Sequence, residues 1–103
     1  MDVEYQSGEL LFEWDSEKAR INKLKHHVSF ETAANVFFDE NRIEKLDEDH
    51  SDDEDRWKVL GKVDTVLFVI YTDRGDRTRI IRQDAPTKTK GENTMATVTY
   101  ILR

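Results

Sequence analysis

The chain has 103 residues, of which 37% are hydrophobic and 37% are charged, and it carries a net charge of −6 with no cysteine. This length and composition predict one globular domain spanning residues 1–103, and they exclude a disulfide framework and cysteine-based catalysis. No apolar run reaches the roughly 18 residues that a membrane-spanning helix requires. The N-terminus, MDVEYQSGEL, lacks the apolar core of a signal peptide, so we expect a cytoplasmic protein with no membrane contact.

The charge is unevenly distributed along the chain. Between Glu44 and Asp55, eight acids accompany one base, which gives this segment a net charge of −7 and leaves +1 for the rest. From Arg74 to Arg103, seven bases and three acids give +4. We interpret the acidic segment as a solvated or partner-binding surface, and the basic one as compatible with RNA binding.

The N-terminal part of the chain predicts a strand followed by a helix. Residues 1–9 show no clear pattern and are expected to be a loose end, whereas LLFEW at 10–14 is typical of a short strand. Asp15 is a favourable N-cap for a basic helix. Apolar residues recur behind it at spacings of three and four, so this helix is expected to bury a stripe formed by Ile21, Leu24 and Val28.

A second helix is expected directly after the first. Ser29 is its predicted N-cap, and no Gly or Pro lies between Asp15 and Phe38, so the two helices should meet in a tight joint near His27. The spacing i, i+3, i+4, i+7 predicts an aromatic, core-facing side formed by Phe30, Ala33, Ala34 and Phe37.

The second half of the chain predicts a sheet. Further strands are expected at 42–47, 57–63, 65–72 and 77–82, with the nearly continuous apolar run at 65–72 as the central strand. We therefore expect an α+β domain in which two N-terminal helices pack on an antiparallel sheet of about four strands. Pro86 and Gly91 argue against a C-terminal helix, and the alternation at 97–102 favours a terminal strand.

No motif for a cofactor or a metal is present in the sequence. There is no glycine-rich phosphate loop, no HExxH and no cysteine cluster. The acidic run that begins at Asp47 superficially suggests calcium, but Asp52 and Lys58 stand where an EF-hand loop needs glycine and glutamate. We expect neither a cofactor nor a metal.

The polar residues are suited to phosphodiester chemistry without a metal. Lys and Arg can stabilise negative charge on a phosphorus transition state, and His can transfer protons near neutral pH. The candidates of these types are Lys25, His26, His50, Arg56, Arg77 and Arg79. Each of them can also be interpreted as an ordinary surface residue that is solvated or ion-paired.

Three blocks of the sequence resemble one protein family. They are FEWDSEKARINKLKHHVSFETAA (Phe12–Ala34), DEDHSDDEDRWKVLGKV (Asp47–Val63) and VIYTDRGDRTRII (Val69–Ile81). In order and spacing they are similar to the signature of the BrnT family over residues 12–81. The resemblance implies a RelE-like fold and a metal-independent endoribonuclease toxin of a type II toxin–antitoxin system. It also implies neutralisation by a BrnA-type antitoxin, with DNA bound only through the antitoxin complex.

The resemblance also nominates a site. By position and chemical type, Lys25, Arg56 and Arg79 are expected to stabilise phosphate charge, and His26 or His50 to transfer protons. Three further basic residues are expected to contact the RNA, namely Arg77, Arg82 and Lys88.

Two departures from the family pattern leave a second hypothesis open. His27 stands where the family usually has glycine, at a helix end that favours a left-handed conformation. After Ile81 the chain reads Arg82-Gln83-Asp84, where the family commonly has Ser-Ala-Arg, so residues 82–103 form a divergent tail. The alternative is therefore a catalytically weakened or inactive relative that binds an antitoxin or associates with itself, for instance as a homodimer.

Overall fold

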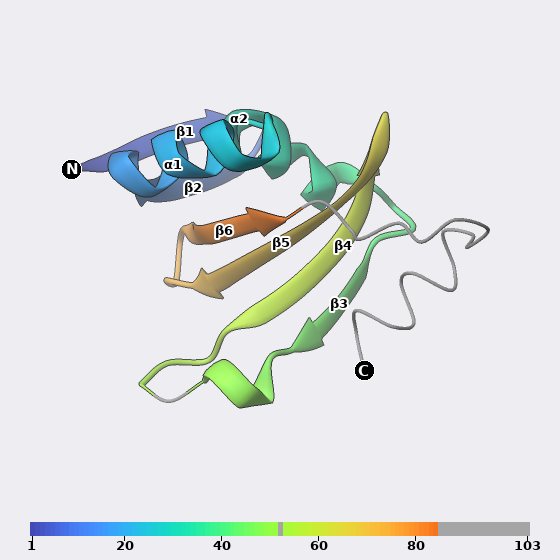
Figure 1. Ribbon diagram of the computed structural model, residues 1–103. Coiled ribbons are helices and arrows are strands. Elements are labelled where there is room, and N and C mark those ends of the chain that lie inside the picture. Colours follow the sequence, from blue (N-terminus) through green and yellow to red (C-terminus); the bar gives the residue numbers. More distant parts are fainter. Residues whose placement is uncertain (52, 85–103) are drawn as a thin grey trace.

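The computed structural model describes residues 1–51 and 53–84, which form a six-stranded sheet with the helical segment 16–38 packed against it (Figure 1). The predicted C-terminal strand at 97–102 and Lys88 lie outside the described residues. The strands are β1 (Asp2–Ser7), β2 (Leu10–Asp15), β3 (Ile43–Leu46), β4 (Trp57–Val63), β5 (Thr65–Asp73) and β6 (Thr78–Asp84). The helical elements are α1 (Ser16–His26), α2 (Phe30–Ala33) and the 3-10 helices η1 (Ala34–Phe38) and η2 (Glu48–His50).

The predicted architecture is wrong. We expected two helices packed on an antiparallel sheet of about four strands, in a RelE-like fold. The sheet has six strands in the order β1-β2-β6-β5-β4-β3, and it is mixed because β2 pairs with β6 in parallel. The second helix is also much shorter than expected, since α2 has four residues before the chain tightens into η1. The sheet therefore dominates the fold.

The segment expected to be a loose end is strand β1. Its polar residues alternate with Val3 and Tyr5, both of which pack against the core. Gly8 turns the chain into β2 with φ +59°, a conformation that glycine adopts without strain. The only apolar residues in 1–9 are Met1, Val3 and Tyr5, too short an alternation to predict a strand, and β1 forms because all six of its residues pair with β2.

Helix α1 begins and ends as predicted but buries a different side. The Asp15 carboxylate accepts a hydrogen bond from the Lys18 N–H at 3.0 Å, and His27 closes the helix with φ 61°. The predicted apolar stripe is wrong, because Ile21 is 40% exposed and Leu24 67% exposed. The buried residue of α1 is Asn22.

The helical segment after Ser29 covers the core as expected. The Ser29 hydroxyl accepts a hydrogen bond from the Thr32 N–H, which confirms the predicted cap. The residues predicted to face the core do so, and η1 brings Val36 against strand β4 at Gly61. A Cβ on residue 61 would lie 2.9 Å from the Val36 Cβ, so glycine is required there for close packing.

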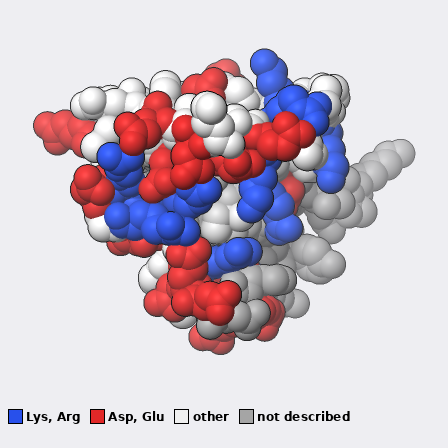
Figure 2. Space-filling view, turned by 90° about the vertical axis from the view of Figure 1, so that its left-hand side faces the viewer, with Lys and Arg blue, Asp and Glu red and all other residues white. Residues whose placement is uncertain are grey.

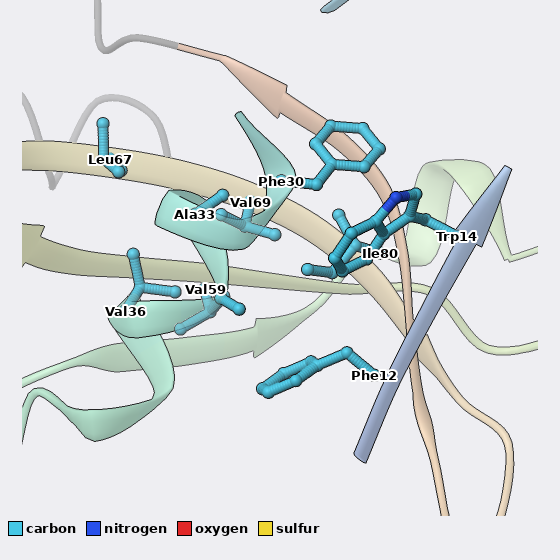
Figure 3. Close-up of a cluster of buried hydrophobic side chains, with 10 residues drawn as sticks. Phe12, Trp14, Phe30, Ala33, Val36, Val59, Leu67, Val69 and Ile80 are labelled. Carbon is cyan, nitrogen blue, oxygen red and sulfur yellow. The ribbon is translucent and has the colours of Figure 1, made fainter. Parts of the chain in front are cut away.

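The main core lies between the helical segment and the sheet (Figure 3). Phe12 and Trp14 from β2 meet Phe30 and residues of β4, β5 and β6 there, and the Trp14 and Phe30 rings pack edge to face at 5.7 Å. A smaller cluster on the opposite face contains Leu60, Phe68 and Ile70. Strand β5 thus buries side chains on both faces, which explains its unbroken apolar sequence and confirms it as a central strand.

Candidate active site

A groove of about 380 Å³ lies between α1 and the end of β6. Three of the sequence-predicted site residues, Lys25, His26 and Arg82, line it together. The other lining residues are Lys18, Ile21, Asn22, Ile81 and Asp84. Residues about sixty positions apart in the sequence therefore line one groove, which combines basic, acidic, amide and apolar side chains.

Helix α1 is held against β6 by a buried pair of amides. The Asn22 side chain donates to Gln83 Oε1 at 3.1 Å and accepts from the Gln83 backbone N–H at 3.1 Å. Strand β2 ends at Asp15, so beyond this point Asn22 supplies the hydrogen bond that a neighbouring strand would give to β6. This pairing fixes the position of the groove, because the groove residues lie on α1 and β6 beside it.

The groove side of α1 follows from helical spacing. Lys18, Asn22 and Lys25 stand four and three residues apart, so they share one side of the helix. Lys25 and His26 occupy its last turn, where the helix dipole favours cations. Within residues 1–51 and 53–84, no acid forms an ion pair with Lys18 or Lys25, so both ammonium groups are available to an anion.

A β-bulge shapes the β6 side. Tyr71 of β5 pairs with Ile80 and Ile70 pairs with Arg82, so Ile81 is an extra residue in β6. Beyond the bulge, the Asp84 carboxylate contacts two predicted site residues. Its Oδ1 lies 3.2 Å from His26 Nε2, and its Oδ2 forms an ion pair with Arg82 Nε at 2.9 Å.

Arg56 lies beside the groove. A small hollow of about 50 Å³ is lined by Asp47, Arg56, Ile70, Ile81 and Arg82, and it shares the last two residues with the groove. Asp47 is only 3% exposed, and its Oδ1 lies 3.6 Å from the Lys58 ammonium. The structure therefore brings Lys25, His26, Arg56 and Arg82 into one continuous region.

Arg77 and Arg79 do not line the groove. Arg79 Nη1 donates to Glu13 at 2.7 Å and its Nη2 to Asp2 at 3.1 Å, while Arg77 pairs with Glu4. The hydrogen bond to Asp2 raises the pKa of Arg79, and the bond to Glu4 raises the pKa of Arg77. On the face shown in Figure 2, acidic side chains lie above and below the central basic ones.

His50 lies at the end of η2, and Lys88 is outside the described residues. Across the described part of the chain, no three His, Cys, Asp or Glu side chains are grouped so that they could hold a metal ion. No helix within that part is long and apolar enough to cross a membrane.

Sequence reasoning missed Lys18, Asn22 and Asp84 as groove residues. The spacing of Lys18, Asn22 and Lys25 was a usable signal, because a polar stripe on a helix can mark the side that faces a site. Asp84 offered no such signal, since its contacts depend on the bulge in β6 and on where α1 crosses the sheet edge.

Comparison with known protein families gives a match that covers most of the chain. Residues 14–88 match the sequence model of a family described as the ribonuclease toxin BrnT of type II toxin–antitoxin systems. The match includes both walls of the groove and extends past Ile81 through Asp84. No curated protein matches the chain significantly.

Proposed function

Because the chain belongs to the BrnT family of ribonuclease toxins, we propose that it is a metal-independent endoribonuclease whose active site is the groove between α1 and β6. Membership of a type II toxin–antitoxin family implies an antitoxin partner and an RNA target. The observation that carries the proposal is the meeting of Lys25, His26 and Arg82 in one groove. Arg56 extends this set from the adjoining hollow.

These side chains supply the two functions that RNA cleavage requires. Lys25, Arg82 and Arg56 stabilise the negative charge that develops on the phosphate, because preorganised cations lower the energy of the transition state more than that of the ground state. His26 accepts the proton of the ribose 2′-OH, with Lys18 as a further phosphate contact. Arg77, Arg79 and Lys88 are proposed as contacts for RNA that extends beyond the groove, and His50 as the second proton-transfer group.

The proposed reaction is an internal transfer at phosphorus. His26 takes the 2′-OH proton, the O2′–P bond forms and the P–O5′ bond breaks. The departing O5′ takes up a proton, for which His50 is the proposed donor. The products are a 2′,3′-cyclic phosphate and a 5′-hydroxyl.

The proposed partner is a BrnA-type antitoxin that neutralises the toxin in the cytoplasm, with DNA bound only through the toxin–antitoxin complex. The acidic segment 44–55 is a suitable surface for a basic partner, because complementary charge speeds and orients association. A homodimer is a further proposal, and sedimentation at several concentrations tests it.

A matched pair of lysines tests the active site. We expect the purified chain to cleave RNA in the presence of EDTA and to leave 2′,3′-cyclic phosphate ends. Lys25→Ala should lower kcat/KM by about tenfold or more, because one charge-stabilising contact is lost. Lys23→Ala removes a lysine from the same helical turn outside the groove, so it should retain wild-type activity. Equal activity in the two variants would contradict the proposed site.

A second candidate function is an antitoxin-binding module with weakened catalysis. Asp84 favours this candidate. Asp84 stands where the family pattern has arginine, and its carboxylate neutralises the Arg82 guanidinium. If this is correct, Asp84→Arg should raise RNA cleavage above that of the unmodified chain. Unchanged or lower cleavage would contradict it.

A further inference from the structure

We propose that Asp84 is a positioning residue that orients both His26 and Arg82 for RNA cleavage. This inference rests on the proposed ribonuclease function, since it assigns a role within the same groove. The single carboxylate reaches a proton-transfer group with one oxygen and a phosphate-binding group with the other.

The contact with His26 selects one form of the imidazole. An ionised carboxylate can only accept hydrogen bonds, so Asp84 Oδ1, 3.2 Å from His26 Nε2, favours the form of His26 in which Nε2 carries the proton. In a neutral imidazole the other nitrogen, Nδ1, then has a free lone pair. Asp84 thereby determines which nitrogen of His26 can accept the proton of the 2′-OH.

The contact with Arg82 leaves its phosphate-binding edge free. Asp84 engages Nε at 2.9 Å, and no hydrogen bond from either Nη atom of Arg82 is present among the described residues. The Arg82 side chain is 57% exposed, so these two groups face solvent at the rim. They can therefore bind two phosphate oxygens while the carboxylate holds the base of the guanidinium.

The backbone that carries Asp84 is well anchored. Asp84 pairs with Phe68 of β5, and its neighbour Gln83 is fully buried and bonded to Asn22. The His26 and Asp84 side chains are each only about 30% exposed, which limits competition from water. A rigid carboxylate with two cationic or polar partners is suited to holding catalytic side chains within the narrow geometry that catalysis requires.

Three variants test the proposal. Asp84→Ala removes the carboxylate and should lower kcat by about tenfold to a hundredfold with a smaller change in KM, because misplaced catalytic groups mainly affect the chemical step. Asp84→Glu should recover part of the loss. The matched control is Asp76→Ala, because the Asp76 carboxylate also lies beside an arginine, 3.8 Å from Arg77 Nε, but outside the groove.

A spectroscopic measurement separates positioning from activity. In ¹⁵N-labelled protein, His26 at high pH should show one tautomer, with Nε2 protonated, and Asp84→Ala should convert it into an exchanging mixture. If the unmodified chain cleaves no RNA, the proposed function fails but this measurement still decides whether Asp84 positions His26. Should Asp84→Ala not fold, Asp84→Leu also removes both acceptor oxygens, with a side chain of similar size.

Two results would overturn the proposal. Increased cleavage in Asp84→Ala would show that the carboxylate competes with phosphate for Arg82 instead of positioning it. Unchanged kcat together with an unchanged His26 spectrum would show that the contact has no functional role.

Discussion

At the scale of single residues, side chains that accept hydrogen bonds from the backbone determine where several elements begin and end. Asp15 and Ser29 were predictable from sequence, because both precede helical patterns and both accept from an N–H three residues later. His27 was predictable as a left-handed residue only through its place in the family pattern. Asp39 was not predictable in this role, since its partner Lys62 is 23 residues away.

Asp39 gives a prediction about pH. Its carboxylate accepts from the Lys62 N–H at 2.8 Å and the Asn41 N–H at 2.9 Å, and these backbone hydrogen bonds lower the pKa of Asp39 below its usual 3.8. A lowered pKa stabilises the fold above the usual value, and this stabilisation is lost as the pH falls through the folded-state pKa. Asp39→Ala should therefore lower the urea midpoint at pH 7 and have less effect near pH 3.

The control for Asp39 is its neighbour Glu40, which is exposed and has no hydrogen bond or ion pair within the described ranges. Glu40→Ala should leave the midpoint unchanged at both pH values. An Asp39→Ala effect of equal size at pH 7 and pH 3 would contradict the assigned role of the carboxylate.

At the scale of elements, the sequence predicted those with a strong local pattern. Strands β2, β4, β5 and β6 all form near their expected positions, because each carries a concentrated apolar or alternating run. Strand β1 and the parallel pairing of β2 with β6 were missed, since both depend on contacts between distant segments. The inward side of α1 was misjudged because the burial of Asn22 depends on Gln83, not on apolar periodicity.

Gly61 tests how η1 packs on β4. Gly61→Ala should destabilise the protein by roughly 1–3 kcal/mol, because the new methyl group would meet Val36 side-chain and backbone atoms in a well-packed core. Urea unfolding measures the change. Gly75→Ala is a useful comparison, since no atom lies within 4 Å of the Cβ position there and only backbone strain at φ +78° is added.

A double substitution tests whether Gly61 and Val36 are in direct contact. Combined with Val36→Gly, the Gly61→Ala substitution should cost less than it does alone, because the Val36 Cβ that would lie 2.9 Å from the new methyl group is then absent. Strictly additive effects would contradict a direct contact between these two residues.

At the scale of the whole molecule, the net charge is −6, yet the protein has basic side chains of two kinds: those paired with acids and those without an acidic partner among the described residues. Arg77 and Arg79 are neutralised by acids of β1 and β2, whereas Lys18 and Lys25 in the groove have no acidic partner in the described structure. The candidate site could be only partly predicted for this reason. Residue type nominated Lys25, Arg77 and Arg79 alike and missed Lys18, whereas the fold determines which of these cations have an acidic partner.

The most direct test of this account is the affinity for an RNA whose scissile 2′-OH is replaced by hydrogen, so that it binds without being cleaved. We expect Arg82→Ala to weaken binding by about tenfold, in line with the loss of a charge-assisted phosphate contact. Arg77→Ala should weaken it less, because Glu4 already holds that guanidinium. A larger loss for Arg77→Ala than for Arg82→Ala would place the RNA on the β1–β6 surface and contradict the groove as the active site.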